Sequence, residues 1–195
     1  MALRRLSNSS IQTNGKSSKL WDQTTFQSGM FALATVNLTS TASSVTFSDI
    51  PANYTHLQIR GAFTATGADQ NVVIQVGNNT IDTGNNYSNH IVLNNNGTVI
   101  ASSSTSASSM NFLGLWYGAS SNSTFIIDCL DYSKTNKNKT FRSLFGNENN
   151  TSGQVGIGSG LWMNQSAITT ITIKASSAQS FNANSHFALY GIKVA

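Results

Sequence analysis

The sequence predicts an all-β protein: an antiparallel β-sandwich, jelly-roll-like, with an extended N-terminal arm. Short segments rich in β-branched and aromatic residues follow one another from residue 31 onward, separated by clusters of Gly, Asn and Ser. Leu57 and Ile59 alternate with Gln58 and Arg60, which is the period-2 pattern of a half-buried strand. Apolar residues nowhere recur at helical spacing over a stretch long enough to predict a helix.

The expected strands are short and closely spaced, as in β-sandwiches and barrels. They cover residues 31–39, 43–47, 54–63, 71–76, 90–94, 98–102, 111–118, 124–132, 140–145, 154–162, 167–175 and 186–194. Pro51, the single proline, is expected to fix a turn before the third of them. Asn96-Gly97 lies between two apolar runs and is the strongest two-residue hairpin signal in the chain. We therefore expect one sandwich domain over residues 31–195, preceded by an arm at residues 1–30.

Three further segments have a distinct composition. In residues 154–162 the glycines at 156, 158 and 160 share one strand face, which predicts close packing within the sandwich or against a neighbouring subunit. The serine-rich stretch 101–109 is expected to form a flexible loop. Residues 133–139 carry several lysines and are expected to form a solvated turn between strands.

The charge content excludes several classes of protein. Only 9% of the residues are charged, whereas roughly 25% are charged in an ordinary soluble domain. The net charge is +4. Such a dilute charge does not predict nucleic-acid binding, which needs several Lys or Arg on one face. No run approaches the roughly 18 apolar residues of a membrane span. Arg4 and Arg5 are followed by polar residues, so we expect no secretory signal.

Residues suited to catalysis are sparse, and we expect the protein not to be an enzyme. His56, His90 and His186 are widely spaced and form no metal-ligand pattern, so no metal or cofactor is expected. Asp128 and Asp131 are the one close acidic pair, and three residues apart on a regular strand they point to opposite faces. No catalytic residue is therefore predicted.

Some residues leave two interpretations open. Cys129 lies in an apolar segment and is expected to be a small buried side chain, with a reactive thiol as the alternative. The loop at residues 77–89 contains Asp82 among several amides, and a turn is favoured over a calcium site because only one carboxylate is present. Trp116-Tyr117 and Trp162 are expected to pack in the core or an interface rather than to stack on sugar rings.

Several sequence blocks, taken together, resemble a known family. They are SSVTFSDIPANYTHLQIRG, IIDCLDYSKTNKNKTFRSLFG, SGLWMNQSAITTITI and FALYGIK, and they occur in this order between about residues 33 and 194. They are similar to small β-sandwich virion proteins of tailed bacteriophages of aquatic bacteria, some of them head decoration proteins and others tail-fibre proteins. The resemblance implies a structural role in the virion and no catalytic residues. It does not extend to the N-terminal arm.

The arm combines apolar and basic side chains without a helical or strand period. Exposed apolar residues in such a segment indicate docking on a partner, and 25 extended residues reach roughly 80–90 Å. The alternative is an unstructured tail whose apolar residues are incidental. The predicted partner-binding residues are Leu3, Arg4, Arg5, Leu6, Ile11, Lys16, Lys19, Leu20, Trp21 and Phe26.

Two functions follow from the resemblance and the arm. The first is a capsid decoration or cement protein, expected to be a homotrimer on the outer capsid surface, whose arm binds the major capsid protein and links capsomers. The second is a tail-fibre or receptor-binding module, whose arm binds tail proteins and whose loops recognise host-surface glycan. Small size and the absence of a coiled-coil shaft favour the first.

Overall fold

Thirteen β-strands and no helix make up the part of the chain that the computed structural model describes, namely residues 29–67, 70–111, 115–116, 121–150 and 152–193. All the strand pairings are antiparallel. The predicted all-β antiparallel sandwich is therefore confirmed. The strands are β1 (Gly29–Asn37), β2 (Ser44–Phe47), β3 (His56–Phe63), β4 (Gln70–Asn78), β5 (Thr80–Ile81), β6 (Tyr87–Asn95), β7 (Thr98–Ala107), β8 (Leu115–Trp116), β9 (Asn122–Leu130), β10 (Lys139–Glu148), β11 (Gly153–Trp162), β12 (Thr170–Ala175) and β13 (His186–Lys193).

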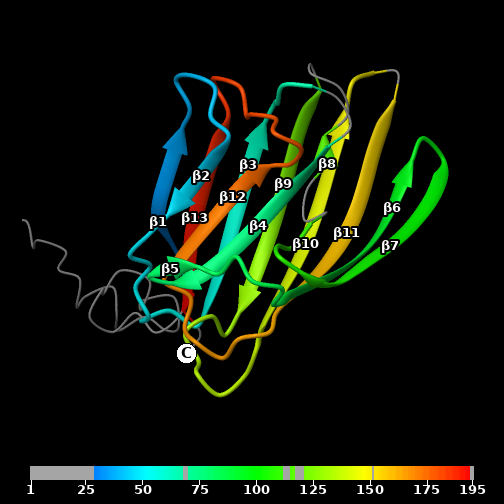
Figure 1. Cartoon of the computed structure of the whole chain (residues 1–195). Helices are drawn as coiled ribbons and strands as arrows, with labels where there is room; N and C mark the ends of the chain where they lie inside the picture. The colour runs from blue at the N-terminus through cyan, green and yellow to red at the C-terminus, as the bar shows by residue number, and fades with distance from the viewer. Residues whose placement is uncertain (1–28, 68–69, 112–114, 117–120, 151, 194–195) are drawn as a thin grey trace, which may run out of the picture.

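Eight of these strands have the connectivity of a jelly roll. The large sheet contains β1-β13-β3-β9 in that order, and the small sheet contains β2-β12-β4, with β8 paired to β4. Counted 1 to 8 along the chain, these strands lie as 1-8-3-6 in one sheet and 2-7-4-5 in the other, the order produced by two Greek keys. Figure 1 shows β2, β12 and β4 lying across the large sheet.

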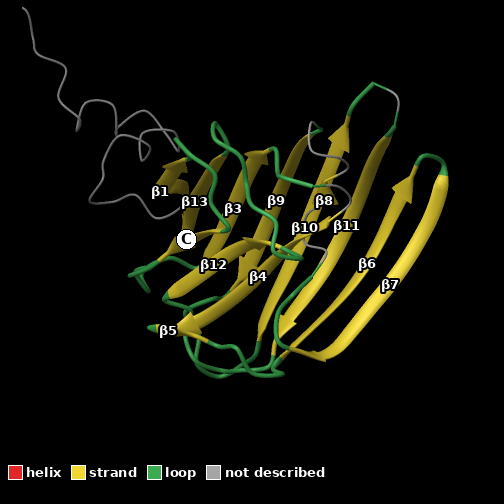
Figure 2. Ribbon diagram, turned by 45° about the horizontal axis from the view of Figure 1, so that its top comes forward, coloured by secondary structure: helices red, strands yellow, loops and turns green. Residues whose placement is uncertain are grey.

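Two hairpins extend the large sheet beyond this jelly roll. The β10–β11 hairpin comes between β9 and β12 in the chain, and the β6–β7 hairpin comes between β5 and β8. They pair side by side, so that the large sheet continues from β9 as β10-β11-β6-β7 and ends at β7. Figure 2 shows this four-strand extension reaching past the small sheet.

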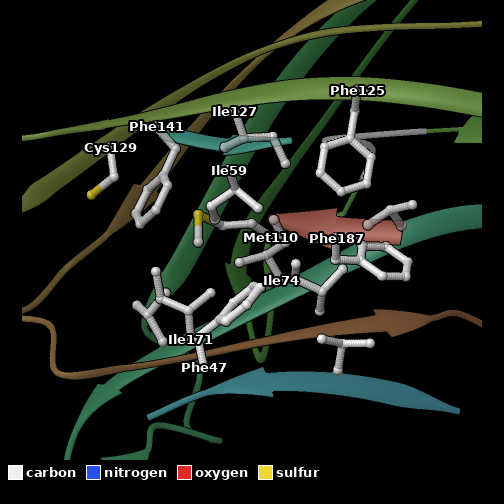
Figure 3. Packing of buried hydrophobic residues seen from close by; sticks show 14 of the residues in the cluster. Phe47, Ile59, Ile74, Met110, Phe125, Ile127, Cys129, Phe141, Ile171 and Phe187 are labelled. Carbon is white, nitrogen blue, oxygen red and sulfur yellow. The ribbon is translucent and has the colours of Figure 1, made fainter. Parts of the chain in front are cut away.

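The core lies between the two sheets. Ile59 and Ile127 of the large sheet point toward Ile74 and Ile171 of the small sheet, and all four are fully buried (Figure 3). A group of phenylalanines fills one end of the core, where the ring centroids of Phe181 and Phe187 are 4.8 Å apart and those of Phe63 and Phe181 are 5.2 Å apart. Burying apolar area at roughly 25 cal/mol per Å² is the dominant favourable term for such a core.

The glycine face of β11 points into the protein, as the sequence predicts. A Cβ atom at Gly156 would lie 2.5 Å from Cζ of Phe145 and 2.7 Å from Cβ of Leu93, and one at Gly160 would lie 2.7 Å from Sδ of Met110. The bare strand face therefore makes room for large side chains of neighbouring strands. Close packing within the sandwich, rather than against another subunit, accounts for these two glycines.

The predicted hairpin at Asn96-Gly97 is confirmed. Asn96 and Gly97 join β6 to β7 with φ angles of 49° and 90°. Positive φ at both central residues is the signature of a type I′ turn, whose twist matches that of the flanking strands. The Gly97 N–H donates to Oδ1 of Asn94 over 2.9 Å, which further fixes the turn.

Two predicted loops differ from the structure. The serine-rich segment expected as a flexible loop at residues 101–109 belongs to β7 as far as Ala107, because pairing with β6 outweighs the low strand propensity of serine. In the basic segment 133–139, Lys139 is not solvated. It begins β10 fully buried, and its Nζ donates to the carbonyls of Lys137 at 2.8 Å and Gln165 at 2.9 Å.

The first prediction concerns the glycine face of β11. We expect Gly156→Ala to lower the free energy of unfolding by about 1–3 kcal/mol, because the new methyl group would overlap the buried ring of Phe145 and the Cβ atom of Leu93. Gly160→Ala is expected to cost less, since the flexible Met110 side chain can move aside. Urea unfolding of both variants measures the difference, and equal losses would contradict the role given to Phe145.

Candidate docking surface on the large sheet

The candidate site is the outer face of the large sheet, defined as the face that points away from the small sheet. Ile126, Leu144, Ile157 and Val92 lie on β9, β10, β11 and β6 as successive register partners. All four are exposed, with 53% of Leu144 and 60% of Ile157 accessible to solvent, and Val155 extends the row on β11. These five residues are called the apolar stripe below. It runs across four strands at right angles to them.

The apolar stripe borders hollows in the outer face. One of them, called the outer-face hollow below, has a volume of about 760 Å³ and spans β10, β11, β6 and β7. Its outward-pointing lining comprises Val92, Ala101, Ile157, Arg142, Ser159, His90 and Ser103. Smaller hollows of about 420 and 280 Å³ adjoin Leu144 and Val155. The outer face is therefore uneven rather than flat, with hollows next to the apolar stripe.

A polar row runs beside the apolar stripe, displaced along the strands by two residues. Nε2 of Gln58 donates to Oδ1 of Asp128 over 2.8 Å, and Nε of Arg60 donates to Oε1 of Gln58 over 2.8 Å. The Arg60 guanidinium also lies over the ring of Tyr190, 5.1 Å from its centroid. Arg142 faces Asp128 in register, but its side chain has no ion-pair or hydrogen-bond partner in the described part of the chain. Its charge remains available to a partner.

The arrangement is suited to binding. Contiguous exposed apolar side chains rimmed by polar groups are typical of interaction surfaces. The polar row holds a carboxylate that is already hydrogen-bonded and a guanidinium that cannot act as an acid or base at neutral pH. No group of three His, Cys, Asp or Glu side chains that could hold a metal ion occurs among the described residues.

Asp128, Asp131 and Cys129 lie in three different settings in the structure. Asp128 points outward from β9, whereas Asp131 lies in the turn after the strand, where its carboxylate accepts a hydrogen bond from Nζ of Lys137 at 2.5 Å. That hydrogen bond lowers the pKa of Asp131, against a smaller opposing effect of burial. Cys129 is fully buried, and burial raises the pKa of its thiol well above the usual range, as expected of a structural cysteine.

The three histidines lie on three different strands of the large sheet. Nδ1 of His56 accepts a hydrogen bond from the backbone N–H of Asp131 over 2.9 Å. His90 is exposed on the outer face beside the outer-face hollow, and His186 begins β13. Of the three histidines, His90 is the one that lines the outer-face hollow.

The Asp82 loop, for which calcium was the alternative, is held by protein groups. The two carboxylate oxygens accept hydrogen bonds from Nε1 of Trp162 at 2.8 Å, Nδ2 of Asn86 at 2.9 Å and the Gly84 N–H at 2.9 Å. Burial opposes ionisation, but the hydrogen bonds from Trp162, Asn86 and Gly84 outweigh it and hold the pKa of Asp82 below its usual value. Asp82 thus organises a turn, as the sequence favoured.

The structure describes one of the aromatic residues considered from the sequence in full, but not the arm. Trp162 is buried in the core, as predicted, with its indole N–H on Asp82. Trp116 lies on β8, but its side chain and all of Tyr117 lie outside the described residues. So do all ten arm residues predicted to bind a partner, namely Leu3, Arg4, Arg5, Leu6, Ile11, Lys16, Lys19, Leu20, Trp21 and Phe26. Their role stays a prediction.

The apolar stripe was missed by sequence reasoning, although a signal for it exists. Residues 125–127 are three consecutive apolar residues, so one of them must face away from the core of a one-sided strand. On β11, Val155 and Ile157 lie opposite the glycine face, and that face turns inward. Apolar residues on the outward phase of neighbouring strands are the pattern that predicts such a surface.

The chain was compared with family models, curated proteins and solved structures. No family model, curated protein or solved structure matches the chain. Within the described residues there is no helix with the length and apolar character needed to cross a membrane.

The second prediction concerns Asp82. We expect Asp82→Asn to lower the free energy of unfolding at pH 7 by about 1–3 kcal/mol, because hydrogen bonds to a charged acceptor weaken. The folded pKa lies below the unfolded value, so ionised Asp82 stabilises the fold above about pH 4, and this stabilisation is lost as the pH falls through the folded pKa.

Thermal unfolding between about pH 2 and pH 7 measures this effect. The variant should lose less stability on acidification than the natural chain. Asp49→Asn, at an exposed turn position with φ of 55° that asparagine also adopts, is the control. If Asp82→Asn lost as much stability on acidification as the natural chain, the role given to the hydrogen bonds of Asp82 would be wrong.

Proposed function

We propose that the protein is a structural component of a tailed-phage virion, a capsid decoration protein that docks on the outer shell. The observation that carries this proposal is the apolar stripe, an exposed apolar row on a regular sheet with no catalytic arrangement beside it. The family resemblance of the sequence and the jelly-roll connectivity of the body support the same role.

The energetics of the apolar stripe fit a protein present in many copies. Each of its five side chains is already partly buried by the sheet, so complete burial would contribute about 1 kcal/mol or slightly more per residue. That total corresponds to weak binding once the cost of association is included. A second contact made by the arm of the same chain would raise the effective affinity, because binding at one place holds the other at a high local concentration.

In this proposal the arm and the body have separate tasks. Leu3, Leu6, Ile11, Leu20, Trp21 and Phe26 are the apolar anchors of the arm, and Arg4, Arg5, Lys16 and Lys19 pair with acidic groups of the major capsid protein. The apolar stripe is the seat of the body on the shell. Binding at two places on one chain links neighbouring capsomers and opposes their separation.

A second function, glycan recognition on the phage tail, is favoured by one observation. The outer-face hollow brings the Arg142 guanidinium, the His90 imidazole and several hydroxyls to one apolar depression, which suits an acidic sugar. The copy number per particle separates the two functions. Quantitative mass spectrometry of purified virions should give hundreds of copies for a shell protein, and a few tens or fewer would favour the tail.

The third prediction tests the apolar stripe directly. We expect Leu144→Lys to abolish binding to particles from which the protein has been stripped, because the charge must be desolvated at the contact. The fold should be unaffected, since Leu144 is half exposed. Ser44→Lys, at an exposed position on β2 of the other sheet, is the matched control. Co-sedimentation with particles measures binding, and equal binding by both variants would contradict docking through the stripe.

The fourth prediction tests the arm. Deleting residues 1–25 should leave a folded body, because the described core is built entirely from Gly29 onward. The truncated protein should unfold with the same urea midpoint as the full chain but no longer sediment with particles. If it still decorates shells, the arm is not an anchor, and the apolar stripe alone carries the binding.

A further inference from the structure

The free edge of the large sheet is unusually well suited to pairing with another strand. β7 is ten residues long and pairs on one side only, with β6, among the described strands. It contains no charged residue and no proline, the two devices that commonly protect an edge. Its side chains are mostly exposed on both faces, and Val99 is 71% accessible. Figure 2 shows β7 at the far end of the sheet.

The backbone groups that β7 offers can be assigned. The Asn96 N–H donates to the carbonyl of Gly153, at the start of β11, so the Asn95 N–H points the other way, toward β7. Thr98 is the register partner of Asn95 and therefore points its own N–H and C=O back at β6. Because the direction alternates along a strand, the N–H and C=O groups of Val99, Ala101 and Ser103 point away from β6.

We propose that β7 pairs with β7 of a second copy of this chain, antiparallel, about a two-fold axis at Ala101. Ala101 then faces Ala101 of the second copy, and Val99 faces Ser103 of the second copy. Each of the three pairs exchanges two N–H···O bonds, which satisfies all the outward groups of this segment. The inference goes beyond the proposed function and does not depend on it.

The shape of β7 favours this register. The hairpin turn ends at Gly97, and the regular pairing of β6 with β7 is interrupted between Ser104 and Ala107, where Ser106 has φ of 50°. The regular part of the strand is therefore residues 98–104, and Ala101 is its midpoint. A two-fold axis there aligns the regular parts of both copies over their full length. The small side chains at 101 and 103 leave room for a neighbouring strand.

Continuity of the outer face also favours a second copy as the occupant. Ala101 is the register partner of Val92, so it continues the apolar row formed by Ile126, Leu144, Ile157 and Val92. The axis at Ala101 therefore joins the rows of the two copies into one apolar row across both sheets. An unrelated strand added to β7 would match the edge but would extend this row only if it carried an apolar residue opposite Ala101.

The symmetry of the contact sets the size of the assembly. A strand that pairs antiparallel with its own copy makes a two-fold contact and uses up both edges, so it closes at two chains. The other end of the large sheet is β1, which this contact leaves free. The inference thus replaces the expected trimer with a dimer. A contact of one strand edge is small, so the dimer should dissociate on dilution.

The test uses the full chain in sedimentation-velocity ultracentrifugation over a range of concentrations. The natural protein should approach twice its 20.8 kDa chain mass at high concentration and dissociate on dilution. Ala101→Pro removes the central N–H without touching the pairing to β6, and should raise the dissociation constant at least about tenfold. Ala101→Ser keeps both the N–H and a small side chain and is the matched control, expected to dimerise like the natural chain.

A second measurement applies to the natural chain alone and does not depend on the folding of a variant. Amide hydrogen exchange of Val99, Ala101 and Ser103 should slow as the protein concentration rises, while that of Thr98 and Ile100 should stay slow throughout. A monomer at all concentrations, a trimer, or rapid exchange of the three amides in the associated protein would each overturn the proposal. A dimer that does not bind shells would leave it standing and count against the decoration role alone.

Discussion

The register between β10 and β11 is the constraint on which the rest of the structure depends. A strand slipped by one residue turns all its side chains to the other face, and hydrophobic patterning normally prevents this. Here the pattern is weak, because β11 carries Val155 and Ile157 on one phase and glycines on the other. Packing decides instead. The ring of Phe145 lies where a side chain at Gly156 would be, so β10 and β11 fit together with the glycines inward.

The orientation of β11 has a direct consequence for the outer face of the large sheet. With the glycines inward, the branched residues of β11 must point outward, next to Leu144 of β10 and Val92 of β6. The same packing that fills the interior with aromatic rings therefore creates the apolar stripe. A change in the phase of β11 would therefore alter the exposed apolar face and the core together. Lys139 fixes the beginning of β10 by binding two loop carbonyls.

Prediction from the sequence succeeded where the signal is local. The alternation in residues 54–63, the Asn96-Gly97 turn and the buried Trp162 each depend on a few neighbouring residues. It failed where tertiary pairing decides. The serines of residues 101–107 form a strand because β6 offers backbone partners, and Lys139 is buried because two carbonyls from separate loops converge on it. The apolar stripe needed the order β9-β10-β11-β6, which is not sequential and so is not readable from spacing.

The two ends of the large sheet complete the argument about assembly. Eight strands at about 4.8 Å spacing place β1 roughly 34 Å from β7. The chain enters the sheet at β1, directly after the arm, whereas the unprotected edge is β7. The contacts proposed for the arm and those proposed for β7 would thus be separated by the width of the sheet, with the apolar stripe between them. In a dimer joined at β7 the two arms would start at opposite ends of the paired sheets, so each could reach a different neighbour on a shell.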